Sequence, residues 1–130
     1  MPMSTINVVT VTNDGDNASY FGERRIELHG TPERMLSEQQ TALNFRLRTS
    51  ASGYLSGWHT AGDPTLLIIL QGEVEIELRN GSAKRFSKGE LFVAQDYLAA
   101  GVLETDQHGH RARLIGEDDL IALHLKLSKR

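Results

Sequence analysis

Three histidines are the residues of this chain best suited to metal or proton chemistry. His108 and His110 are two positions apart, so that in a strand both rings point to the same face. Together with His59 they could form a three-nitrogen site with open positions, which suits Zn, Fe, Ni or Mn. His59 alone could serve as a catalytic base or as a hydrogen-bond partner for a bound acid or sugar. The competing interpretations are a solvated loop around His108 and Gly109, and a structural histidine at position 59.

Aromatic side chains near these histidines could line a pocket for a small organic ligand. Trp58 directly precedes His59. Tyr54 and Tyr97 are the other candidate ligand-binding residues, although Tyr54 also fits an ordinary core position.

Alternating arginines raise a further possibility. A guanidinium can bind a carboxylate or phosphate through two parallel hydrogen bonds, so a pair of these side chains could reach an anion in a cavity. The favoured interpretation nevertheless places them outward, in solvent. A solvated or packing role is also favoured for His124, which shares a strand face with Ala122 and Lys126. The arginines concerned are Arg46, Arg48, Arg111 and Arg113.

The composition argues against several classes of function. The chain has 130 residues, a formal net charge of -3 and a sequence pI near 5.9, which argues against nucleic acid or an anionic membrane as the main partner. It has no cysteine, and hence no disulfide and no thiolate metal site. No apolar run approaches the roughly 20 residues of a membrane span. Residues 1–4 lack the layout of a signal peptide, so a cytoplasmic location is expected.

The strands that must position the candidate residues are clearest between residues 58 and 94. Leu66–Leu70 is continuously apolar, as in a strand buried on both faces. Glu73–Leu78 alternates strictly between glutamate and apolar residues, as in a half-buried strand whose glutamates face solvent. Glu90–Ala94 is the next expected strand.

Asn80-Gly81 predicts a two-residue hairpin, because both central residues of a type I′ turn need positive φ. That loop length pairs Glu77 with Lys84, which places opposite charges across the ladder. It also leaves Phe86 on the glutamate face, which a bulge or cover from another strand or subunit could explain.

The remaining segments extend the same pattern. Met35–Gln39 is expected to form a short helical turn, capped by Thr31 with Pro32 in its first position. Residues 95–107 are too apolar for a plain loop and have no clear period, so they are expected to be an irregular insertion or lid. About eight to ten short strands then predict one all-β domain, a sandwich or a barrel. The other expected strands are Ile6–Thr12, Ser19–Leu28, Thr41–Thr49, Tyr54–Thr60, His110–Ile115 and Leu120–Leu127.

Several short motifs, taken in order, resemble those of the cupin superfamily of small jelly-roll barrels. Trp58-His59, followed by the strands that end at Gly72, resembles the first cupin motif, and Phe86–Glu90 resembles the start of the second. Gly109–Arg113 resembles the Gly-His-Arg ending of a group of small single-domain cupins, and Ser19-Tyr20-Phe21 resembles their opening strand. The resemblance implies a double-stranded β-helix over residues 1–130, with an N-terminal strand arm at residues 1–18.

The chain departs from the cupin pattern at the metal ligands. His59 matches the first histidine, but Ala61 stands in place of the second and Thr65 near the expected glutamate. At strict spacing Ala100 replaces the last histidine. The preferred alternative is a longer connection that brings His110 into that position. In both cases the usual set of three histidines and one carboxylate is absent.

The resemblance therefore implies a small cupin that binds a small organic ligand in its barrel and whose metal site has degenerated. The alternative is a metal-dependent enzyme of the dioxygenase or isomerase and epimerase type that uses His59, His108 and His110. A metal-free variant would use His59 as base and a tyrosine as acid. Edge strands and the β-branched N-terminal arm favour a homodimer. A purely structural dimerisation module, with a filled barrel, is a third possibility.

Overall fold

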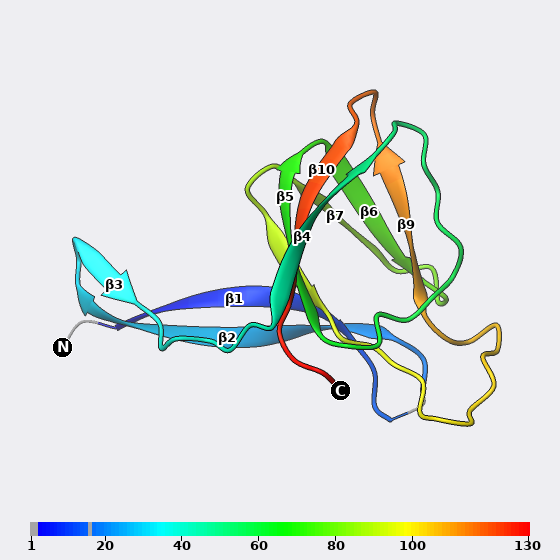
Figure 1. The fold of residues 1–130 in the computed structure, drawn as a ribbon, viewed down its shortest axis with the longest axis horizontal. Coiled ribbons are helices and arrows are strands. Elements are labelled where there is room, and N and C mark those ends of the chain that lie inside the picture. The colour runs from blue at the N-terminus through cyan, green and yellow to red at the C-terminus, as the bar shows by residue number, and fades with distance from the viewer. Residues whose placement is uncertain (1–2, 16) are drawn as a thin grey trace.

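A computed structural model describes residues 3–15 and 17–130 of the chain. Within these residues every regular element is a β-strand, which confirms the expected all-β class. Figure 1 labels the strands in chain order. They are β1 (Met3–Thr12), β2 (Tyr20–Thr31), β3 (Arg34–Leu36), β4 (Asn44–Ser50), β5 (Thr65–Gln71), β6 (Glu73–Leu78), β7 (Ala83–Ser87), β8 (Leu91–Ala94), β9 (His110–Ile115) and β10 (Leu120–Lys126).

The strands form two sheets that pack against each other. The larger has seven strands in the order β3-β2-β1-β8-β5-β10-β4, and the smaller has three in the order β7-β6-β9. Ile69 and Phe92 of the larger sheet share one buried cluster with Val74 and Phe86 of the smaller, and the rings of Phe86 and Phe92 stack with centroids 4.3 Å apart. Among the described residues neither sheet closes on itself, so the core is a two-sheet sandwich rather than one continuous barrel sheet.

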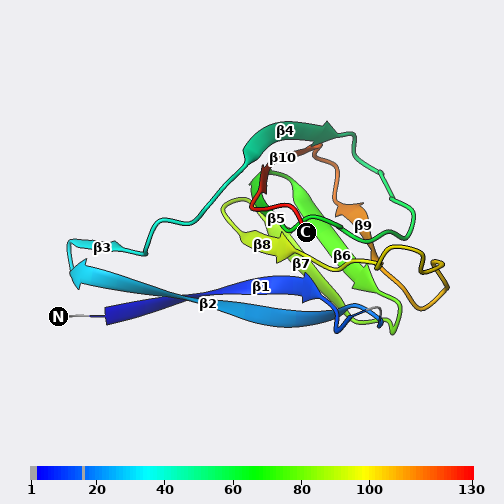
Figure 2. The same ribbon diagram turned by 60° about the horizontal axis from the view of Figure 1, so that its bottom comes forward.

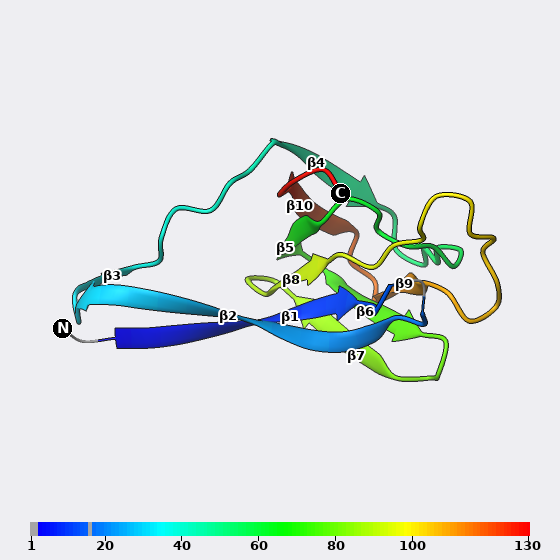
Figure 3. The ribbon, with the colours of Figure 1, turned by 90° about the horizontal axis from the view of Figure 1, so that it is seen from below.

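The N-terminal hairpin extends well beyond this sandwich. β1 pairs with β2 along ten positions, from Met3 opposite His29 to Thr12 opposite Tyr20. β8 joins β1 only at Val9–Val11. Figures 1, 2 and 3 all show the far half of the hairpin projecting from the body, with β3 at its tip. The expected N-terminal arm, residues 1–18, contains β1 but not its partner β2, and Met1, Pro2 and Asp16 lie outside the described residues.

The hairpin between β6 and β7 has a different register from the one expected. Leu78 N donates to Ser82 O, so the loop has three residues and the ladder pairs Glu77 with Ala83. Gly81 takes the positive φ of 89° that such a loop requires at its last position. The shift by one residue places Phe86 opposite Val74, on the buried face, and removes the misfit that the two-residue loop created.

The expected helical turn at Met35–Gln39 is wrong. The short strand β3 instead forms a hairpin with the end of β2, in which Thr31 pairs with Arg34. Pro32 fixes its own φ, and this suits the second position of a tight turn as well as the first turn of a helix. The part of the chain that the structure describes has no helix long and apolar enough to cross a membrane.

Candidate functional site: a cavity between the two sheets

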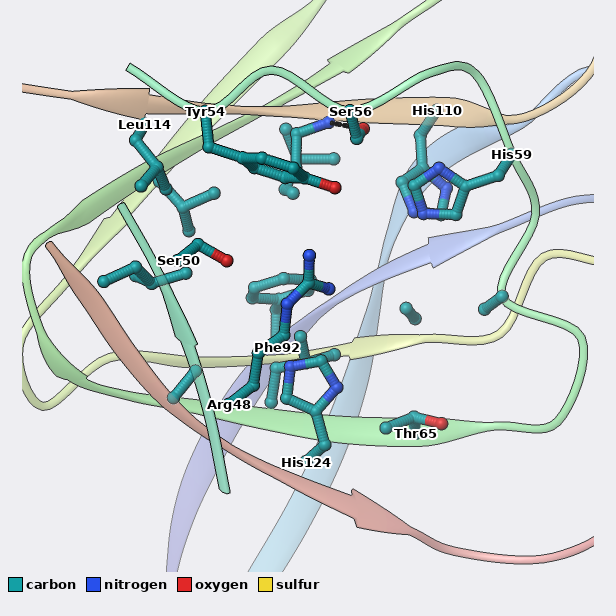
Figure 4. A pocket seen from close by; sticks show the side chains of 18 of the residues that line it. Arg48, Ser50, Tyr54, Ser56, His59, Thr65, Phe92, His110, Leu114 and His124 are labelled. Atoms are coloured by element: carbon teal, nitrogen blue, oxygen red, sulfur yellow. Dashed lines mark hydrogen bonds between the residues drawn. The ribbon is translucent and has the colours of Figure 1, made fainter. Parts of the chain in front are cut away.

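A cavity of about 470 Å³ lies between the inner faces of the two sheets, and we refer to it as the inter-sheet cavity. Ile69, Val74, Ile76 and Phe92 supply apolar lining from both sheets. Figure 4 shows the polar side chains around it: His59 and His110 lie together, and Arg48 and His124 lie together at a second position. In the first pair, His110 comes from β9 and His59 from the segment before β5. In the second pair, Arg48 comes from β4 and His124 from β10.

His59 and His110 meet through their backbones as well as their rings. Each N–H donates to the other residue's carbonyl at 2.9 Å, and the ring centroids are 4.6 Å apart. This close approach needs Gly109, whose φ is +82° and where a Cβ would lie 2.6 Å from the His59 carbonyl oxygen. The sequence therefore positions the two histidines with a two-residue antiparallel bridge rather than with a full strand at residues 54–60.

Asp96 holds His110 from behind. Its side chain has no solvent exposure, and its Oδ2 accepts hydrogen bonds from His110 Nδ1 at 2.8 Å and from Ser19 Oγ at 2.6 Å. Its Oδ1 accepts the Ala61 N–H at 2.9 Å. Burial is the largest effect and raises the pKa of Asp96. The hydrogen bond and charge of His110, together with the hydrogen bonds from Ser19 and Ala61, outweigh burial and leave the pKa below its usual range. The pair is therefore a carboxylate that fixes a histidine.

The hydrogen bond to Asp96 places the proton of a neutral His110 on Nδ1 and leaves the lone pair on Nε2. His59 is oriented in the same way, because its Nδ1 lies 2.9 Å from the carbonyl oxygen of Gly57. Among the described residues neither Nε2 atom has a hydrogen-bond partner, whereas every buried side-chain nitrogen or oxygen has one. Both Nε2 atoms are therefore accessible, and both rings line the cavity. Each can accept or donate a proton there.

His108 lies elsewhere. The His108 side chain is buried, and its Nδ1 accepts a hydrogen bond from the Thr105 N–H at 2.9 Å. This bond closes a turn at the end of the 95–107 segment. β9 begins only at His110, so the spacing of two does not place both rings on one strand face. The described residues contain no group of three histidine, cysteine or carboxylate side chains that could hold a metal ion. His59 and His110 supply two nitrogens, and the Asp96 oxygens are already occupied by three donors.

The structure places two of the three predicted aromatic residues at the cavity. Trp58 lines it, and the guanidinium groups of Arg79 and Arg111 lie 4.1 and 4.7 Å from its ring centroid. Tyr54 also lines it, with its hydroxyl directed inward in Figure 4. Tyr97 does not: its ring packs against Arg130, and its backbone is bound on both sides by Asn13.

Arg48 and His124 line the cavity, although their alternating pattern favoured outward positions. On β10 the inward residues are Ala122 and His124, while Leu123 and Leu125 belong to the opposite face. On β4 the outward residues are Phe45 and Leu47, which are 66% and 62% exposed. Alternation identifies the two faces of a strand correctly but does not say which of them is inside.

Asp96 is the functional residue that sequence reasoning missed. It is the single charged residue in the apolar stretch from Leu91 to Ala100. A carboxylate in such a stretch indicates a buried, hydrogen-bonded group, and this signal could have identified it.

No protein-family model matches this chain, and none of the curated proteins matches it. Solved structures that resemble it include a cupin domain from Bordetella pertussis, at 10% identity over 94% of this chain and 93% of that chain, with a TM-score of 0.48. A cupin-2 domain protein from Shewanella frigidimarina has 18% identity over 65% of this chain and 69% of its own, with a TM-score of 0.46. The Cnp3 cupin domain of Schizosaccharomyces pombe has 14% identity over 95% and 84%, with a TM-score of 0.47. None of these similarities establishes an activity or a ligand for this chain.

Proposed function

We propose that this protein is a small cupin that binds a small organic molecule in the inter-sheet cavity and presents His110 to it as a proton acceptor or donor. The observation that carries the proposal is the Asp96–His110 pair at 2.8 Å, with His110 only 4% exposed and its Nε2 directed to the cavity. A buried carboxylate behind a histidine fixes the tautomer and the ring orientation, and stabilises the imidazolium that forms when Nε2 takes a proton. In this proposal the two sheets are the two halves of a cupin jelly roll.

The cavity has the size and lining that such a ligand needs. Sites for small organic molecules are typically about 300–1,000 Å³ and mainly apolar with a few directed polar groups. The inter-sheet cavity, at about 470 Å³, combines apolar residues from both sheets with His59, His110, Tyr54, Arg48 and His124. It is therefore a lined site rather than a barrel filled with side chains.

A metal-independent acid–base enzyme of the isomerase or epimerase type is the second candidate function. Two accessible imidazoles with 4.6 Å between their centroids, and a tyrosine hydroxyl directed into the same cavity, favour it. In such a reaction Nε2 of His110 would remove a proton from a carbon or hydroxyl of the ligand, and His59 or Tyr54 would return a proton on another side. The sequence-based alternative uses His59 as the base. His59 has a backbone carbonyl behind its ring, where His110 has the buried Asp96 carboxylate.

The metal-dependent alternative is less well supported by the donor set. A site made of His59, His108 and His110 would require the His108 ring to leave its hydrogen bond with Thr105 and move to the cavity. With two imidazole nitrogens and no free carboxylate, the described residues do not fit a resident divalent ion of the cupin kind.

Amide-detected NMR with mixtures of small organic compounds tests the binding proposal. We expect the shifted amides to be those of the cavity wall, such as Gly57, Ala61 and Ala112. We expect Ala122→Phe, which fills the cavity from β10, to abolish these shifts while the protein stays folded. Shifts confined to other surfaces, or unchanged in the filled variant, would contradict the proposal.

Deuterium incorporation separates binding from catalysis. Compounds that bind are incubated with the protein in D2O, and the loss of carbon-bound protons is followed by NMR. Exchange that disappears in His110→Gln supports the acid–base enzyme. Binding without exchange in the unmodified protein limits the function to ligand binding.

We also propose that the protein is a homodimer formed through an outer apolar face of the larger sheet. Two rows of residues cross β4, β10, β5 and β8 on this face without a charged side chain. An apolar face is complementary to a copy of itself across a two-fold axis. The β1–β2 hairpin, which projects from the body in Figure 2, offers further edge for such a contact. The rows are Phe45, Leu125 and Leu66, ending at Val93, which is already buried within the chain, and Leu47, Leu123, Ile68 and Leu91.

A further inference from the structure

Basic side chains gather at one end of the inter-sheet cavity. In the β4–β10 ladder Arg46 pairs with His124 and Arg48 pairs with Ala122, so the two arginines and the histidine share the inward face. Arg48 and His124 line the cavity, and both continue into an adjoining groove that Arg46 and Lys126 also line. Figure 4 shows the Arg48 guanidinium inside the cavity, between Tyr54 and His124. We call Arg48, Arg46 and His124 the basic end.

The basic end has no counter-ion in the part of the chain that the structure describes. Three arginines of the smaller sheet are ion-paired: Arg85 and Arg113 with Glu75, and Arg111 with Glu77. Neither arginine of the basic end makes an ion pair among the described residues, and no acidic side chain belongs to the cavity lining. The cavity lining therefore carries positive charge at this end without a carboxylate to balance it.

The two arginines also act on the pKa of His124. Burial, and then the charges of Arg48 and Arg46, lower the pKa of His124. The two guanidinium groups thus act on the ring without a compensating carboxylate. An anion placed between them would relieve this repulsion, and a cavity wall of low dielectric would strengthen its attraction.

The two arginines lie on the inward face of β4, at the rim of the inter-sheet cavity. On β4 the outward positions hold Phe45 and Leu47, which are largely exposed, while the arginines occupy the inward face. Arg46 and Arg48 are themselves exposed, so an incoming ligand can reach their guanidinium groups from solvent. Tyr54 adds support, because the Arg48 guanidinium carbon lies 5.3 Å from its ring centroid and this contact holds the group over the cavity.

We propose that the ligand of the inter-sheet cavity is a small organic carboxylate, whose carboxylate group is bound by Arg48 at the basic end while the rest of the molecule extends toward His110. A guanidinium presents two parallel N–H groups that match a carboxylate, which an ammonium cannot do. This inference rests on the proposed function and specifies its ligand class. A neutral sugar or an amine would leave the basic end unpaired.

Matched acid and amide probes test this inference, with Trp58 as the reporter because it is the single tryptophan and lines the cavity. The probes are benzoate with benzamide and butyrate with butyramide, titrated at pH 7.5 and low salt. We expect each acid to bind about tenfold more tightly than its amide, as for a charge-assisted pair. We expect Arg48→Gln to remove this preference.

Arg113→Gln is the matched control, because it also removes one guanidinium but from a residue that is paired with Glu75 outside the cavity. It should keep the preference for acids. Acids and amides that bind equally, a preference that survives in Arg48→Gln, or no response to either acid would overturn the inference. If acids and amides bind equally but Ala122→Phe still blocks their binding, the proposed cavity binding stands and only the carboxylate preference fails. The failure of this inference is therefore distinguishable from the failure of the proposed function.

Discussion

The Nδ1 atom of His110 lies 2.8 Å from Oδ2 of Asp96, and the same oxygen accepts the hydroxyl of Ser19 at 2.6 Å. Three parts of the chain meet at this oxygen: the residue just before β2, the residue two positions after β8, and the first residue of β9. The contact is inaccessible to solvent, and it determines which nitrogen of His110 is offered to the cavity. The tautomer of His110 is therefore set by the fold rather than by the ligand.

Asp96→Asn should reverse the His110 tautomer. The amide that replaces Oδ2 is a donor and would face two donors, so His110 Nδ1 must become an acceptor and its proton must move to Nε2. We expect a loss of about 1–3 kcal/mol in the free energy of unfolding. Long-range 1H–15N NMR of the imidazoles measures the tautomer, and urea unfolding measures the stability.

Asp63→Asn is the control for this substitution, because Asp63 is partly exposed and pairs with Lys126 near the surface. Its effect should stay within about 0.5 kcal/mol. An unchanged His110 tautomer in Asp96→Asn would contradict the assigned role of Asp96.

The same carboxylate predicts a pH dependence of stability. The pKa of Asp96 is lower in the folded protein than its ordinary value, which is about 3.9 for an unfolded chain. Its stabilising contribution is therefore fully present above that value and is lost as the pH falls through the lower, folded pKa. The stability difference between the unmodified protein and Asp96→Asn should shrink between pH 5 and pH 3, as measured by urea unfolding at each pH. A difference that grows toward pH 3 would refute this sign.

Gly109→Ala should destabilise the fold more than an ordinary glycine substitution. Gly109 has φ +82°, and an added Cβ would lie 2.6 Å from the carbonyl oxygen of His59, so both backbone strain and a clash result. We expect a loss of about 2–4 kcal/mol. Gly81→Ala is the matched control, since Gly81 has φ +89° but nothing within 4 Å of the added carbon, and about 1 kcal/mol is expected there. Equal losses in thermal and urea unfolding would show that the His59–Gly109 approach is not tight.

Local sequence signals predicted most of the strands. The alternation in Glu73–Leu78 and the span His110–Ile115 agree with β6 and β9 to the residue. The errors occurred where a local signal has two physical solutions. Asn80-Gly81 fits a two- or a three-residue loop, and only the burial of Phe86 against Phe92 selects the second. Thr31-Pro32 fits a turn or a helix start, and pairing with β2 selects the turn.

The candidate site was only partly predictable because its polar residues are brought together by tertiary contacts. His59 and His110 could be named from the cupin resemblance and the motif spacing, but the carboxylate that orients His110 comes from a segment with no periodic signal. The inward face of β4 and β10 could not be deduced either. Both strands carry large apolar residues on the face that is outside, so the usual rule of apolar residues inside gives the wrong orientation for β4 and β10.

Because His124 lies at the basic end of the cavity, we expect binding of an organic anion to strengthen as the pH falls. Its pKa is lowered by burial and then by Arg48 and Arg46, so the ring is neutral at pH 7 and takes up a proton only below its ordinary value of about 6.5. Lys126 on the same strand is paired with Asp63, and Leu67 opposite His124 on β5 adds no charge. A bound carboxylate favours the charged ring, so proton uptake accompanies binding.

The affinity of benzoate should therefore rise between pH 8 and pH 5.5, where benzoate itself stays ionised. Trp58 fluorescence at each pH gives the Kd. His124→Gln should flatten this dependence, whereas His59→Gln, which removes another cavity imidazole, should retain most of it. A slope unaffected by His124→Gln would assign the proton to a different group.

The outer apolar face predicts that two substitutions convert a dimer into a monomer. Phe45 and Leu47 lie on the edge strand β4, are 66% and 62% exposed, and begin the two apolar rows that cross to β8. We expect the unmodified chain to be dimeric and Phe45→Glu combined with Leu47→Glu to be monomeric, because two desolvated carboxylates would oppose their copies across the two-fold axis. Light scattering after size-exclusion chromatography gives the mass.

Leu103→Glu is the control, since Leu103 is 84% exposed but lies in the 95–107 segment, away from this face, and should leave the mass unchanged. A monomeric unmodified chain, or a dimer that persists in the double variant, would exclude this face as the interface.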